Sequence, residues 1–193
     1  MVGAIKENQN TSGVHPLKFA LWLIIVSIIM MFAAWTSAYI VRKEEGNWLE
    51  FALPGTFMLN TSILVLSSVF MQLAYFSAKS DNIGKLKVYL LGTFGTGLGF
   101  LIGQWEAWKE LVNHKVFFGG AEANPSGSFL YVLTGIHGFH LVTGLIFVLI
   151  VLISSHQFKV HSRNLLRIEL CTTYWHFLGG LWIYLYIFLT LNH

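Results

Sequence analysis

Charged side chains are scarce in this sequence: 11% of its 193 residues are Asp, Glu, Lys or Arg, whereas 55% are hydrophobic. A water-soluble domain of this length needs far more polar surface, so the composition indicates an integral membrane protein. The net charge is only +3, and the basic residues lie in short loops between apolar runs. That distribution is typical of membrane topology and argues against nucleic acid as a partner.

Cysteine and proline are also rare. The single cysteine, Cys171, excludes an intrachain disulfide. No apolar run is interrupted by an internal proline and no repeat relates the runs, so the broken helices and inverted repeats of secondary transporters are not visible. The sequence contains no nucleophile elbow, P-loop or CxxC motif, and therefore does not indicate a self-sufficient enzyme. The first apolar run is too long for a cleavable signal peptide.

Long hydrophobic runs, by contrast, are abundant. A helix that spans a bilayer needs about 20 mostly apolar residues, and five runs in the sequence qualify. We therefore expect an all-α integral membrane bundle of five transmembrane helices that follows a polar tail. The expected tail covers residues 1–15, the single domain covers residues 16–193, and the spans lie at about 19–41, 54–78, 88–108, 128–155 and 168–192.

The loops between these runs divide the basic residues unevenly. Eight of the twelve lysines and arginines lie on the side that holds the polar tail, and four lie on the other side. Positively charged loops are retained in the cytoplasm. We therefore expect a cytoplasmic N-terminus and, after five spans, a periplasmic C-terminus.

Small residues follow a regular pattern in the third run, which reads GTFGTGLGFLIG. Gly95, Gly99 and Gly103 recur there every four residues. This period places them on one face of a helix, and small residues let helix backbones approach each other closely in a membrane. We therefore predict a helix-packing face at these three glycines.

Polar residues interrupt the fourth and fifth runs. The segment TGIHGFHLVTG places His137 and His140 three residues apart, and Glu169, Thr173 and His176 follow each other at steps of four and three residues. Both patterns keep the side chains on one side of a helix. Because polar groups in apolar helices face protein instead of lipid, these five residues are the candidate site.

Three interpretations of these residues remain open. They could hydrogen-bond across helices, bind a metal ion, or relay protons. Metal sites in helical bundles usually show Glu-x-x-His pairs or more carboxylates, whereas only Glu169 accompanies the histidines here. The residue types therefore favour an interhelical polar core over the other two interpretations.

Longer segments carry a family resemblance. LNTSILVLSS, GLGFLIGQ, SGSFLYVLTGIHGFHLVTG and ELCTTYWHF occur in this order. Together they resemble subunit III of haem-copper respiratory oxidases in its short, five-helix bacterial form, and the resemblance covers nearly the whole chain. The combination of TGIHGFH with Glu169, seven residues before His176, is its most specific part.

The resemblance implies a non-catalytic subunit of the bacterial inner membrane, with no catalytic, cofactor-binding or metal-binding residues of its own. It implies packing against the catalytic subunit I and contact with other oxidase subunits, which hold the haem and copper, reduce oxygen and translocate protons. Bound phospholipid is a further expectation. Cytochrome c is the expected electron donor of the complex. The alternatives are a quinol oxidase and an independent small transporter or channel.

The sequence departs from the family pattern at three positions. Many members have glutamates at the positions of Ile28 and Ala107 and an aspartate at the position of Gly179. Since this chain lacks those carboxylates, the resemblance favours a structural brace over a proton-uptake device.

Overall fold

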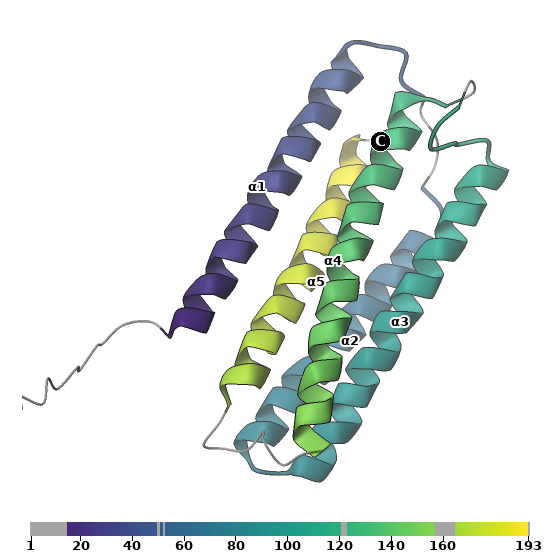
Figure 1. Ribbon diagram of the computed structural model, residues 1–193. Coiled ribbons are helices and arrows are strands. Elements are labelled where there is room, and N and C mark those ends of the chain that lie inside the picture. Colours follow the sequence, from purple (N-terminus) through teal and green to yellow (C-terminus); the bar gives the residue numbers. More distant parts are fainter. Residues whose placement is uncertain (1–14, 50, 52, 121–122, 157–164, 193) are drawn as a thin grey trace, which may run out of the picture.

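The first helix begins at the edge of the described chain. The computed structural model describes residues 15–49, 51, 53–120, 123–156 and 165–192 (Figure 1). The tail expected over residues 1–15 therefore lies outside the described residues, apart from its last position. His15 caps the helix, because its Nδ1 accepts a hydrogen bond from the Leu17 amide at 3.2 Å. Pro16 follows at the first helical position, where no N–H is needed.

Helices make up most of the described chain. Five of them are long and apolar enough to cross a membrane, and no strand occurs in the ranges that the structure describes. The prediction of an all-α fold with five membrane-spanning helices is therefore confirmed. The helices are α1 (Pro16–Glu44), α2 (Thr56–Lys79), α3 (Ile83–Asn113), α4 (Pro125–His156) and α5 (Leu166–Asn192).

Helix ends differ from the ends of the apolar runs. The helix α3 begins at Ile83 instead of near residue 88, because Asn82 caps it: the Asn82 Oδ1 accepts a hydrogen bond from the Lys85 amide at 3.2 Å. Hydropathy identifies only the part of a helix that lies in the hydrocarbon core of the bilayer. The capping groups determine where the hydrogen-bonded helix starts. Charged residues such as Lys85 and Lys87 can therefore belong to the helix.

The five helices form a bundle with one outlying member. The helices α2 and α3 pack closely along each other, and α4 and α5 lie between this pair and α1 (Figure 1). Within the described ranges, α1 contacts only α4 and α5. The helices α4 and α5, which carry the candidate polar residues, therefore contact all three other helices between them.

Several large aromatic side chains pack in the core where the middle helices meet. Trp175 and Trp182 of α5 are each only 1% exposed. The Trp182 ring stacks on Phe57 of α2 with centroids 6.1 Å apart and meets Phe100 of α3 edge-on at 4.7 Å. Stacked and edge-on arrangements are favourable for aromatic pairs. Such packing matters here because lipid gives helices little hydrophobic reason to associate.

Candidate functional site

Glu169 lies in the first turn of α5 and pairs with a lysine of α1. The Lys18 Nζ is 2.7 Å from the Glu169 Oε1, and both side chains are partly exposed, at 36% and 42%. An ion pair at this exposure contributes about 0–1 kcal/mol. The predicted carboxylate therefore tethers α5 to α1 and does not contact the histidines.

The other end of α1 is also tied to α5. Tyr39 and Lys43 both donate hydrogen bonds to the backbone carbonyl of Asn192, at 3.2 and 2.7 Å. Between the two ends, the Tyr184 hydroxyl donates to the Thr36 Oγ1 at 3.2 Å. Polar contacts thus hold the outlying helix near both of its ends.

His176 joins α5 to α2. Its Nε2 is 3.0 Å from the Gln72 Oε1, and because an amide oxygen only accepts, the imidazole donates this hydrogen bond. Thr173, by contrast, donates to the carbonyl of Glu169 in its own helix at 2.9 Å. Of these two predicted residues, His176 therefore makes the contact between helices.

His140 lies in a short chain of hydrogen bonds between α4 and α5. Its Nδ1 is 2.8 Å from the Ile136 carbonyl, so Nδ1 carries a proton. The Thr143 hydroxyl donates to the His140 carbonyl at 2.6 Å. Since its one proton is used there, Thr143 accepts from the Tyr174 hydroxyl of α5, 2.9 Å away. The bond to α5 is thus made by Thr143, which is three residues from His140.

His137 occupies the centre of the bundle. Its side chain is fully buried, and its ring lies 5.0 Å from the ring of Trp182 and 5.9 Å from that of Phe100. Neither ring nitrogen has a hydrogen-bond partner within the described residues. His137 therefore packs among aromatic rings, and no described residue uses its hydrogen-bonding capacity.

The predicted polar residues do not converge on one point. Glu169 faces α1, His176 faces α2, and His137 lies beside α3 and α5. Across the described part of the chain, no group of three or more His, Cys, Asp or Glu residues is placed to hold a metal ion. The arrangement joins helices in pairs, which is the geometry expected of a brace.

Hydrogen bonds from tryptophan complete this set of contacts. The Trp182 Nε1 of α5 donates to the Thr61 Oγ1 of α2 at 3.0 Å, and the Trp108 Nε1 of α3 donates to the Thr134 Oγ1 of α4 at 3.1 Å. The sequence shows the threonines as hydroxyls in apolar runs, but their tryptophan partners lie on other helices. Spacing along one helix could not have paired them.

The three predicted packing glycines differ in what lies next to them inside this chain. A Cβ atom added at Gly95 or Gly99 would meet nothing within 4 Å, whereas one at Gly103 would collide with the Asn60 side chain. Close packing within this chain occurs at Gly97, where an added Cβ would lie 2.8 Å from side-chain atoms of both Leu145 and Trp175. At its first two positions the four-residue pattern thus marks a face of α3 that no other described side chain approaches closely, and the packing role of Gly95 and Gly99 stays a prediction.

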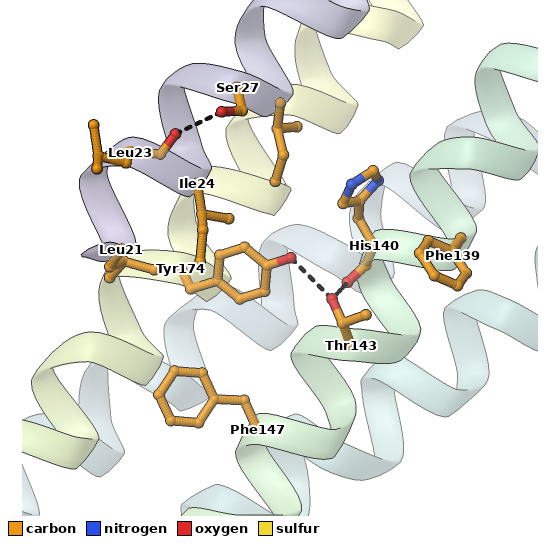
Figure 2. Close-up of a pocket in the computed structure, with 10 residues that line it drawn as sticks. Leu21, Leu23, Ile24, Ser27, Phe139, His140, Thr143, Phe147 and Tyr174 are labelled. Atoms are coloured by element: carbon orange, nitrogen blue, oxygen red, sulfur yellow. Dashed lines mark hydrogen bonds between the residues drawn. The ribbon is translucent and has the colours of Figure 1, made fainter. Parts of the chain in front are cut away.

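A cleft separates the N-terminal half of α1 from α4 and α5 (Figure 2). Its volume is about 610 Å³ and its lining is mostly apolar. Ser27 of α1 lies on one side of the cleft, and His140, Thr143 and Tyr174 contribute polar groups on the other. Leu21 also lines a second pocket, of about 210 Å³, together with residues of the Lys18–Glu169 ion pair.

Comparison with known proteins identifies the family. The family model described as cytochrome c oxidase subunit III matches residues 2–192. The chain belongs to this family. As subunit III of a haem-copper oxidase it is not catalytic itself, and it is a multi-pass protein of the bacterial cell membrane. The predicted family, non-catalytic role and localisation are confirmed.

Individual relatives include both types of oxidase. Cytochrome bo(3) ubiquinol oxidase subunit 3 of Buchnera aphidicola subsp. Schizaphis graminum is 29% identical over 193 residues, which cover 97% of this chain and 98% of the relative. Cytochrome c oxidase subunit 3 of Synechocystis sp. is 32% identical over 178 residues, or 88% and 72% of the two chains. The probable cytochrome c oxidase subunit 3 of Mycobacterium tuberculosis is 29% identical over 194 residues, with 91% of each chain covered.

Membership of the subunit III family also bears on the partners and on the alternative functions of this chain. Other oxidase subunits are the expected partners of this chain, and the match favours an oxidase subunit over an independent transporter or channel. The role of the polar residues in subunit III stays a prediction. The contacts described above show which residues lie next to each predicted residue, so that the role of each one can be tested by substitution.

Proposed function

We propose that this subunit III braces the catalytic subunit I of a haem-copper oxidase that reduces oxygen and translocates protons. The observation that carries the proposal is the family match over residues 2–192, in a chain whose five helices can all span a membrane. The experiment is affinity purification of the chain from its native membrane in mild detergent. Haem absorbance and copper should accompany the tagged chain and disappear when the subunits are dissociated. Stoichiometric haem or copper on the isolated chain would contradict the proposal.

We assign the contact with a partner subunit to the open face of α3. Gly95 and Gly99 lie there with no atom of the described chain near their Cβ positions, so a helix of another subunit can approach closely. Gly99→Leu should therefore reduce the amount of subunit I that copurifies. Gly180→Leu on α5 is the matched control, because that glycine also has open space around it. Equal copurification of the two variants would count against the assignment.

The predicted polar residues act, in this proposal, as the interhelical brace itself. His140, Glu169 and His176 connect or flank contacts between α5 and the other helices, Thr173 supports the first turns of α5, and His137 fills the centre. Apolar replacement of His176 should loosen α5 from α2 and lower the resistance of the complex to dissociation. A wild-type midpoint of dissociation in that variant would argue against the brace.

We infer a cytoplasmic N-terminus and a periplasmic C-terminus from the uneven distribution of basic residues. The loop after α1 then faces the periplasm and the loop after α2 faces the cytoplasm. In cells whose outer membrane is permeabilised and whose inner membrane is intact, Glu45→Cys should react with a membrane-impermeant maleimide. Ser80→Cys should react only after the inner membrane is opened as well. The native Cys171 is buried and gives little background. The reverse labelling pattern would overturn the orientation.

We also propose that the cleft beside α1 holds an acyl chain of a phospholipid. The cleft is mostly apolar, and Leu21 connects it to the pocket at Lys18, whose ammonium can bind a lipid phosphate. Ser27→Phe should fill the cleft and reduce the lipid retained by the purified complex, as measured by native mass spectrometry. Ser62→Phe is the control, because both serines are exposed and donate to the carbonyl four residues earlier. Equal lipid retention would remove this assignment.

The electron donor is the remaining part of the proposal. We propose cytochrome c, in keeping with the description of the matching family, and the ubiquinol oxidase subunit from Buchnera supports quinol as the second candidate. Oxygen consumption by the purified complex with reduced cytochrome c, compared with a quinol, decides between them. Activity with quinol alone would replace the first candidate by the second.

A further inference from the structure

Three polar side chains in the centre of the bundle are buried without a hydrogen-bond partner among the described residues. Asn60 and His137 are 0% exposed and Gln104 is 3% exposed. None of the amide or imidazole nitrogen and oxygen atoms of these residues has a hydrogen-bond partner among the described residues. A buried polar group without a partner is destabilising, and lipid cannot supply one. Partners for these atoms must therefore come from elsewhere.

Asn60 of α2 lies against Gly103 of α3, the residue before Gln104. The amide of Asn60 occupies the place where a side chain on Gly103 would begin, and Gly103 immediately precedes Gln104. The glycine at position 103 therefore leaves room for the amide between the two helices. The position of Asn60 is thus built into the packing of α2 against α3.

Gln104 lies between two residues of α3 that contact α4 near His137. One turn before Gln104, Phe100 contacts the His137 ring at 5.9 Å. One turn after it, the Trp108 Nε1 donates to Thr134, which lies three residues before His137. Because residues four apart share a helix face, Gln104 lies on the face of α3 that these two contacts turn towards α4.

Trp182 of α5 closes the same region from a fourth helix. Its ring lies 5.0 Å from that of His137 and 4.7 Å from that of Phe100, and stacks on Phe57, which is three residues before Asn60. Its own Nε1 is already bonded to Thr61. The indole therefore borders the region but has no N–H left to donate to any of the three polar side chains.

We propose that Asn60, Gln104 and His137 bind ordered water in a sealed polar site where α2, α3 and α4 meet. The two amides and a neutral imidazole present both donors and acceptors, and water complements both kinds. A buried water typically makes about three hydrogen bonds, which matches the three unpartnered side chains on three packed helices. A metal ion fits less well, because the three side chains carry no negative charge to compensate a buried cation.

The water gives three helices one shared point of attachment. Each side chain can satisfy its polar atoms only while the other two hold the water in place. Removing one of them therefore leaves the remaining two without their shared partner, so that much of the destabilisation appears at the first replacement.

The direct test is electron cryo-microscopy of the assembled oxidase at a resolution that shows ordered water. We expect at least one water density about 3 Å from polar atoms of two or more of the three side chains. Direct hydrogen bonds among the side chains with no water between them would overturn the proposal, and so would density for a coordinated metal ion. This measurement uses the unmodified complex and does not depend on any variant assembling.

A double-mutant cycle supplies the second test. Gln104→Leu and His137→Phe should each lower the detergent concentration at which subunit III dissociates, and the double variant should lose little more than the more damaging single one. His176→Phe is the control partner for Gln104→Leu, because His176 bonds to Gln72 instead, so their effects should add. Additive effects of Gln104→Leu and His137→Phe would contradict a shared water.

Discussion

Gly97 offers the sharpest test of how α3 meets α4 and α5. A Cβ atom at this position would lie 2.8 Å from the Leu145 Cδ2 and 2.8 Å from the Trp175 Cη2. The leucine end can rotate away, but the indole is a rigid ring in a side chain that is only 1% exposed. Gly97→Ala therefore forces the helices apart or displaces the tryptophan.

The size of the effect follows from comparison with a glycine in open space. Replacing a helical glycine by alanine stabilises the helix by about 0.5–1 kcal/mol, and this gain is common to Gly97→Ala and to Gly138→Ala on α4, where an added Cβ meets nothing within 4 Å. Overpacking of a close-packed interior costs about 1–3 kcal/mol. The gain in helix stability is the same in both variants and cancels when they are compared. We therefore expect Gly97→Ala to be less stable than Gly138→Ala by about 1–3 kcal/mol, the cost of overpacking.

The assay is titration of the purified oxidase with sodium dodecyl sulfate in mixed micelles, followed by the loss of subunit III from the complex. Gly97→Ala should dissociate at a lower detergent fraction than the wild type, and Gly138→Ala at the same or a higher one. If Gly97→Ala were as resistant as Gly138→Ala, the close approach of α3 to Trp175 would be refuted.

Three further variants separate weak contacts from strong ones in the same assay. Lys18→Ala removes the exposed ion pair with Glu169 and should cost about 0–1 kcal/mol; a larger loss would mean that the pair is shielded from water. Thr61→Val leaves the buried Nε1 of Trp182 without an acceptor and should cost about 1–3 kcal/mol, so unchanged stability would show that the indole finds another partner. Tyr174→Phe removes one hydrogen bond between α4 and α5 and should cost about 0.6 kcal/mol, and a loss beyond 2 kcal/mol would contradict a single bond of this kind.

The number and type of helices could be predicted because one physical requirement dominates. Hydrocarbon demands about 20 apolar residues per helix, whatever the helix packs against. The start of α3 at Ile83 could not be predicted from the same pattern, because it depends on the cap formed by Asn82. A capping residue satisfies a local hydrogen bond and leaves no trace in hydropathy.

The candidate site could be predicted as a set of residues but not as a set of contacts. Glu169 stands out as the acid in an apolar segment, yet its partner Lys18 is 151 residues away in the sequence. Periodicity says which residues share a helix face, and it does not say which neighbour that face meets. The glycines show the same limit, since the regular pattern includes Gly99 in open space, whereas Gly97 makes the tight contact.

The position of these contacts along the helices explains why α1 is the outlying member. Its polar ties to α5 lie largely at its ends, at Lys18 and at Lys43, where water and headgroups compete with them. The hydrogen bond that Trp182 of α5 donates to Thr61 of α2 comes from an indole that is only 1% exposed, so water competes with it less. The helices α2 to α5 therefore form the stable part of the subunit. The cleft beside α1 adds to this difference, because what fills it must come from the surrounding membrane or from a partner.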